Sequence, residues 1–182
     1  MITLLEKIRT SCNSKRLLAV SSIVYCCSQL AIGAILEPLG IDRVMRLQTT
    51  LSAEVMTSVL NGWRDAGLIH WYTRHFYVDF FHPVFYVTML IALLSRLLSD
   101  GNFPPKWNLL LLVPVTAGAM DIVENIFQLM FVADPASLTS AAAFVSGAAT
   151  MTKWGLAFFS VCAIIVLTAK RMGRGRTSQG TR

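Results

Sequence analysis

Long apolar segments with few charged residues, separated by more polar stretches, set the pattern of this chain. Four segments reach the ~20 residues that a membrane-spanning helix requires: about 17–36, 76–98, 107–132 and 141–169. The pattern predicts an all-α integral membrane protein whose spans form a four-helix bundle, a single membrane domain over residues 1–182. A cleaved signal peptide ending near Ala31 or Gly33 is the alternative for the first segment, but that segment exceeds the ~7–15 residues of a signal core.

The one long polar stretch, residues 37–75, lies between the first two segments. Ser52 is a favourable N-cap, and Glu54 lies in the first turn after it. Apolar residues then recur at helical spacing until Asn61 and Gly62, a typical helix end. We expect a short amphipathic helix over residues 52–60, lying across the mouth of the bundle. Aromatic side chains with a polar edge favour the membrane interface, and three follow this helix: Trp63, Trp71 and Tyr72.

Composition supports a bilayer as the solvent of this chain. Apolar residues make up 54% of it, charged residues 14%, and the mean hydropathy is +0.58, whereas a soluble domain has about 25% charged residues. The net charge of +6 does not indicate nucleic acid, because most basic residues lie in the N-terminal segment, the connection between the second and third spans, and the tail 170–182. Lys and Arg collect on the cytoplasmic side, so the sequence predicts an inner (plasma) membrane protein with both termini cytoplasmic.

Several ionisable residues interrupt the apolar spans, where such groups are costly and are therefore candidate functional residues. His75, Asp79 and His82 follow one another at offsets of four and three, which places them on one face if the second helix is continuous. At ~1.5 Å per residue, these groups and those of the last two spans fall between the outer rim and the midplane. We expect one polar pocket there, open to the outer face. Its candidate catalytic residues are Asp79, Asp121, Glu124, Asn125 and Lys153.

The formal charge of the expected pocket is negative. Asp79, Asp121 and Glu124 bring three negative charges against the one positive charge of Lys153. A proton, a nearby basic side chain or a bound cation has to supply the rest, because an unpaired buried carboxylate raises its pKa and takes up a proton. Pro83 adds a free acceptor, since it has no N–H to donate to the carbonyl oxygen of Asp79. The sequence therefore predicts a site that attracts a proton or a cation.

Three kinds of function fit such a site. The first is binding of a small polar, cationic or lipid-headgroup ligand. The second is an intramembrane hydrolase or lipid-modifying enzyme, using metal-free acid/base chemistry or a divalent metal, since imidazole and carboxylate suit zinc and iron. The third is a structural ion cluster that fixes helix register in an assembly or accessory protein, with a homo-oligomer left open by small residues in the last span. The metal ligands would be His75, Asp79, His82 and Glu124.

The second and third spans carry two short motifs. Asp79, Phe80, Pro83 and Tyr86 form a D-F-x-x-P-x-x-Y pattern, and residues 121–125 form D-x-x-E-N. Over roughly half of the chain, this combination resembles a group of small bacterial four-span membrane proteins with no established activity. The resemblance implies a bacterial four-span fold and no particular chemistry. His82 stands where the pattern of that group has an apolar residue.

Overall fold

The computed structural model describes residues 2–177, with side chains for residues 3–173. Every regular element in this part of the chain is a helix, as the apolar pattern predicts. The α-helices are α1 (Ile2–Ser11), α2 (Lys15–Leu36), α3 (Ile41–Gln48), α4 (Ala53–Asp65), α5 (Ile69–Asp79), α6 (His82–Asp100), α7 (Leu112–Ala133) and α8 (Ser140–Thr177). The 3-10 helices are η1 (Glu37–Leu39), η2 (Pro105–Leu111) and η3 (Pro135–Ser137). The end of the basic tail, residues 178–182, lies outside the described residues.

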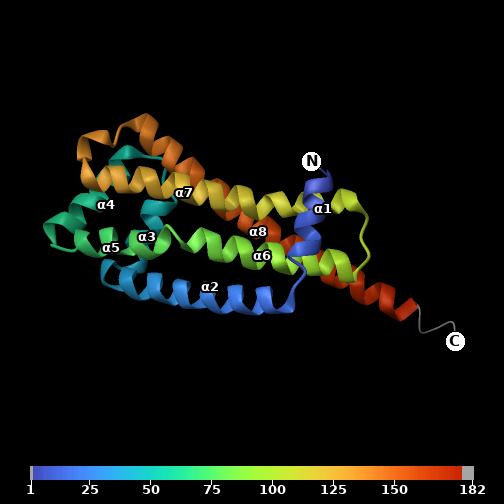
Figure 1. Cartoon of the computed structure of the whole chain (residues 1–182). Helices are drawn as coiled ribbons and strands as arrows, with labels where there is room; N and C mark the ends of the chain where they lie inside the picture. The colour runs from blue at the N-terminus through green and yellow to red at the C-terminus, as the bar shows by residue number, and fades with distance from the viewer. Residues whose placement is uncertain (1, 178–182) are drawn as a thin grey trace.

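Four helical stretches are long and apolar enough to cross a membrane: Lys15–Leu39, His82–Asp100, Pro105–Ala133 and Ser140–Gly173. The long helices lie side by side, with α7 along α8, α2 along α6, and α6 also against α7 (Figure 1). Large apolar side chains cover their outer surface; Ile23 is 64% exposed and Phe158 is 71% exposed. A soluble monomer rarely exposes so large an apolar surface. This surface and the four stretches support the prediction of a membrane-embedded protein.

The segment between α2 and α6 folds against one end of the long helices, on the left in Figure 1. We call η1, α3, α4 and α5 together the cap, and this end the cap end. The core of the cap contains the fully buried Leu47, Leu60 and Trp63 and reaches Phe131 of α7. The opposite end, called the tail end, holds α1, η2 and the last turns of α8. Both ends of the described chain therefore lie on the same side of the molecule (Figure 1).

Two of the aromatic residues expected at the membrane interface are buried in the cap instead. The indole N–H of Trp63 donates to the carbonyl oxygen of Leu39 at 3.1 Å. Tyr72 is also buried, and its ring centroid lies 4.9 Å from that of Trp63. A buried indole or phenol usually finds a hydrogen-bond partner, so an aromatic residue with a polar edge suits a protein core as well as an interface. The interface prediction for Trp63 and Tyr72 was wrong for this reason.

Helix α4 is the expected amphipathic helix, but it ends later than predicted. The Ser52 hydroxyl accepts a hydrogen bond from the N–H of Val55 at 3.4 Å, which confirms the N-cap. The helix then continues past the Asn-Gly pair to Asp65. Its end is set by Gly67, whose φ of +69° favours glycine. This residue belongs to a Schellman motif, in which the following N–H donates to the carbonyl oxygen of Trp63 at 2.7 Å.

The expected second span is divided into two helices, which is the main correction to the predicted fold. Helix α5 ends at Asp79 and α6 begins at His82, so the spanning helix covers residues 82–100 and not 76–98. Pro83 lies in the first turn of α6. There its missing N–H is tolerated, whereas inside a continuous helix its ring would clash with the preceding turn. The other three spans agree with their predicted bounds to within a few residues, except that α8 continues to Thr177.

Basic side chains join the helices at the tail end. Arg9 of α1 donates to the carbonyl oxygen of Phe103 at 2.9 Å and to Oδ1 of Asn108 at 3.1 Å. Lys170 of α8 lies over the ring of Trp107, with Nζ 4.8 Å from the ring centroid. Arg9 and Lys170, which were expected to orient the protein in the membrane, therefore also hold α1 and α8 against the residues around η2. The contact between Lys170 of α8 and Trp107 of η2 also shows that these two residues lie at the same height along the bundle.

Candidate functional site

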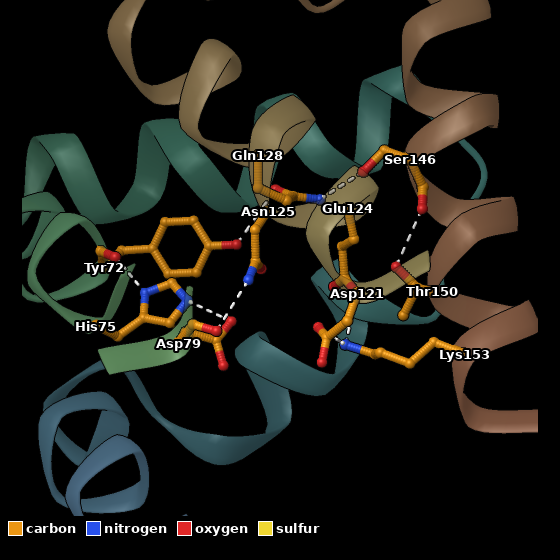
Figure 2. A network of polar contacts seen from close by, with 10 residues as sticks. All are labelled: Tyr72, His75, Asp79, Asp121, Glu124, Asn125, Gln128, Ser146, Thr150 and Lys153. Atoms are coloured by element: carbon orange, nitrogen blue, oxygen red, sulfur yellow. Dashed lines mark hydrogen bonds and ion pairs between the residues drawn. The ribbon is translucent and has the colours of Figure 1, made fainter. Parts of the chain in front are cut away.

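A buried ion cluster joins α7 to α8 where the long helices meet the cap (Figure 2). Lys153 Nζ lies 3.0 Å from Asp121 Oδ1 and 2.5 Å from Glu124 Oε2. The two carboxylates stand three residues apart on α7 and so share one of its faces. Both side chains are 4% exposed. The structure thus brings together three of the five candidate residues, and the trio keeps one negative charge in excess.

A fourth candidate, Asn125, links α7 to the break between α5 and α6. Its side-chain Nδ2 donates to the main-chain oxygen of Asp79 at 3.3 Å. This is the carbonyl that Pro83 cannot serve, as the sequence predicts. A buried carbonyl without a donor is costly, so the asparagine amide replaces the missing helical hydrogen bond. In Figure 2 the side chains of Asp79, Asn125 and Asp121 point toward one another from α5 and α7.

The fifth candidate, Asp79, lies beside His75 at the end of α5. His75 Nδ1 is hydrogen-bonded to the main-chain oxygen of Tyr72. Because a carbonyl oxygen only accepts, Nδ1 carries the proton, and in the neutral ring Nε2 is then an acceptor. That Nε2 lies 3.9 Å from Asp79 Oδ2. The imidazole therefore turns a lone pair, and no donor, toward the carboxyl group.

The surroundings favour the uncharged forms of both groups in α5, which lies outside the four candidate spans. Burial lowers the pKa of His75 to about 4, against the rise caused by its bond to Tyr72. Burial also raises the pKa of Asp79 to about 7, and the negative charge of Asp121 adds to this rise. Lys153 opposes it without cancelling it. Asp79 is thus an acid that exchanges its proton near neutral pH.

A chain of hydrogen bonds runs beside the cluster from the cap to α8. The hydroxyl of Tyr72 donates to Gln128 Oε1 at 3.2 Å, and Gln128 Nε2 donates to Ser146 Oγ at 3.1 Å. Thr150 donates to the main-chain oxygen of Ser146 at 3.0 Å. Sequence reasoning missed the place of Tyr72 in this chain. The signal was present, because Tyr72 stands three residues before His75 and shares its helix face.

His82 lies apart from this network. Its Nδ1 is 2.9 Å from Ser28 Oγ of α2, and its ring packs between Tyr25 and Tyr86 at centroid distances of 5.4 and 5.5 Å. The break before α6 ends the helix face that it was expected to share with His75. Within residues 2–177, no group of three or more His, Cys, Asp or Glu side chains is placed to hold a metal ion. The four residues predicted as metal ligands, His75, Asp79, His82 and Glu124, are therefore not brought together.

No known protein family, curated protein or solved structure matches this chain. The resemblance to small bacterial four-span proteins stays a prediction.

Proposed function

We propose that this protein is a multi-pass four-helix bundle of the inner membrane that binds a small cationic ligand at Asp79 and Asp121. Its termini would be cytoplasmic, which is supported by the basic residues of α1, η2 and the end of α8 at the tail end. The ligand class is an organic amine or a similar small cation, whether free or carried by a lipid headgroup. The residues that would bind it come from α5 and α7.

The observation that carries this proposal is the missing counter-charge of Asp79. Asp121 and Glu124 share the ammonium group of Lys153. Beside the Asp79 carboxyl group lie the acceptor nitrogen of His75, at 3.9 Å, and the amide of Asn125, and neither of these carries a positive charge. A buried carboxylate in this position takes up either a proton or a cation. Burial and the charge of Asp121 raise the pKa of Asp79 to about 7. Near neutral pH, Asp79 can therefore exchange its proton for a bound cation.

Lys153 itself indicates which cations the cluster accommodates. It is a primary ammonium on a flexible chain, and it donates to Asp121 from a position that is 11% exposed. A second ammonium between Asp79 and Asp121 would make the same charge-assisted hydrogen bonds, which are the strong ones in a buried site. The positive charge of this second ammonium would also remove the repulsion between the carboxylates of Asp79 and Asp121. This chemistry favours an amine with N–H donors over a quaternary ammonium.

The position of the cluster supports entry from the cap end. Trp107 and Lys170 are an aromatic and basic pair of the kind that marks a membrane boundary. From Lys170 to Lys153, helix α8 rises about 26 Å at ~1.5 Å per residue, and a hydrocarbon core is ~30 Å thick. The cluster would then lie only a few ångströms inside the opposite boundary. Asp79 lies beside the cluster and is more accessible than its carboxylates, because its side chain is 16% exposed against 4% for Asp121 and Glu124.

Thermal unfolding of the detergent-solubilised protein, followed by tryptophan fluorescence, tests this proposal. Ethanolamine should raise the melting temperature saturably, and more at about pH 8 than at about pH 6, because Asp79 must lose its proton to bind a cation. Asp79→Asn should abolish the shift. Asp65→Asn, which removes an exposed carboxylate of the cap, should leave it intact. An equal shift in both variants, or no shift in the parent protein with ethanolamine, would contradict the proposal.

One observation favours a second function, acid/base catalysis on a lipid ester. The tautomer of His75 is fixed by Tyr72, and its free Nε2 faces a carboxyl group that titrates near neutrality. Such a pair is typical of general acid/base chemistry. In proteoliposomes containing a labelled phospholipid, this function predicts slow product formation that His75→Gln removes. Amine binding should survive that substitution, so the two functions are separable.

A further inference from the structure

A second feature of the cap end, apart from the carboxylate cluster, is a hollow of about 340 Å³ between α3 and α8. Its size falls within the ~300–1,000 Å³ of ordinary ligand pockets. The lining atoms are almost all apolar. Its walls are formed by Met45 and Gln48 of α3, by Thr49 directly after this helix, and by Thr150, Met151 and Trp154 of α8.

The hollow opens on the apolar outer surface of the protein and not toward its interior. Met151 is 47% exposed and Trp154 is 53% exposed, on the same helix as the apolar Phe158. Trp154 stands about 24 Å from the level of Lys170 along α8, and Thr150 about 30 Å, at ~1.5 Å per residue. For a core ~30 Å thick, the hollow therefore sits at the cap-side boundary. Lipid acyl chains meet their glycerol and phosphate groups at this level.

A cationic residue directly follows the lining residue Met45 in the sequence. Arg46 of α3 is exposed and forms no ion pair with any described residue. It precedes Thr49 by three residues, so the two side chains are neighbours on the helix surface. A guanidinium group binds phosphate oxygens in a bidentate manner. Arg46 thus offers a cation to a phosphate, while the walls offer apolar surface to a hydrocarbon chain.

We propose that this hollow binds a single phospholipid of the cap-side leaflet. One acyl chain lies between Met45, Met151 and Trp154, and Arg46 holds the phosphate. Methionine side chains adapt to an irregular chain, so an acyl chain in the hollow can make close van der Waals contact with its walls. The inference is independent of cation binding at Asp79. Thr150 separates the two sites, because it lines the hollow while its hydroxyl donates toward Ser146.

Native mass spectrometry of the protein released from nanodiscs of dioleoyl-phosphatidylglycerol tests this proposal. The parent protein should retain one lipid. Thr49→Trp fills the hollow and should reduce lipid retention by about tenfold or more. Thr116→Trp is the matched control, since Thr116 is exposed on α7 and, like Thr49, bonds the carbonyl oxygen four residues before it. It should retain the lipid.

The phosphate contact is tested by a second pair of variants. Arg46→Gln should weaken retention about tenfold or more, as expected for a lost charge-assisted bond. Arg43→Gln, on the same helix, should have no effect. Circular dichroism checks the helix content of each variant, and Arg46→Gln remains decisive if Thr49→Trp does not fold. The proposal would be overturned if all variants retained the lipid equally, or if all of them lost it equally. It would also be overturned if the parent protein were a lipid-free dimer that Thr49→Trp dissociates.

Discussion

His75 Nε2 and Asp79 Oδ2 lie 3.9 Å apart on successive turns of α5, and neither group carries its usual charge near pH 6. In the unfolded chain the histidine holds a proton between about pH 4 and 6.5 while the aspartate has lost one. In the folded protein the proton is on the aspartate instead. The pair as a whole binds the same number of protons in both states, although the proton changes place.

This exchange predicts opposite pH dependences for two single variants. The folded pKa of His75 is depressed, so its contribution to stability is full above about 6.5 and is lost as the pH falls toward about 4. The folded pKa of Asp79 is raised, so its contribution is full below about 3.8 and is lost as the pH rises toward about 7. Between about pH 4 and 6.5, the contribution of His75 to the free energy of unfolding therefore rises with pH while that of Asp79 falls. In the parent protein these two changes cancel.

Asp79→Asn should therefore become more stable as the pH rises through this window, and His75→Gln less stable. Each slope is at most about 1.4 kcal/mol per pH unit. The measurement is the free energy of unfolding in mixed detergent micelles, determined by denaturant titration at several pH values. Slopes of the same sign in the two variants would show that the pair does not exchange a proton on folding.

Removing the cluster lysine should be severe. Lys153→Met leaves Asp121 and Glu124 buried beside each other without a cation, and breaking a buried ion pair in this way costs about 3–5 kcal/mol. Glu124→Gln in the same chain removes one of the two charges and should recover much of this loss. Lys170→Met, a lysine on the exposed surface of α8, serves as the control and should cost far less. If Lys153→Met were as stable as that control, the cluster would contribute nothing to the fold.

The hydrogen bond from Asn125 to the main chain should depend on Pro83. Asn125→Leu leaves the carbonyl oxygen of Asp79 without a donor and should cost about 1–3 kcal/mol. Pro83→Ala restores an N–H that can reach this carbonyl, so Asn125→Leu should cost much less in that background. A double-mutant cycle of unfolding free energies measures the coupling. Additive effects would mean that the amide and the proline act separately.

Two glycines of α8 should respond oppositely to alanine. A Cβ on Gly147 would stand 2.3 Å from the main-chain oxygen of Thr50, in the loop between α3 and α4. Gly147→Ala should therefore push the cap away and cost about 1–3 kcal/mol. Gly155 has open space around it, so Gly155→Ala should stabilise the helix by about 0.5–1 kcal/mol. Thermal unfolding of both variants checks the contrast, and equal effects would show that the close approach of the loop is unimportant.

The long helices could be predicted from the sequence because their apolar runs are long and contain few charged residues. The sequence likewise predicted that Asp121, Glu124 and Lys153 belong to one polar pocket, as charges of opposite sign. Whether these residues act on a ligand stays a prediction. Apolar residues lie on both sides of the break between α5 and α6 and also within it, at Phe80 and Phe81. The apolar pattern alone therefore extended the second span across this break.

The cap was harder to predict for a different physical reason. Trp63 and Tyr72 are apolar with a polar edge, and a helix face of this kind packs equally well against lipid headgroups or against other helices. Sequence cannot distinguish these two environments. Only the three-dimensional arrangement shows that the partners of these residues are Leu39 and Gln128.

The contacts of Arg9 have a consequence for synthesis of the chain. Its guanidinium group binds Phe103 and Asn108, more than ninety residues later in the sequence. Chains emerge N-terminus first, so α1 exists long before its binding site does. It has to wait until the hairpin between α6 and α7 has been made and inserted. Helix α1 is thus synthesised before α6 and α7 but reaches its final place after them, and its docking completes the tail end.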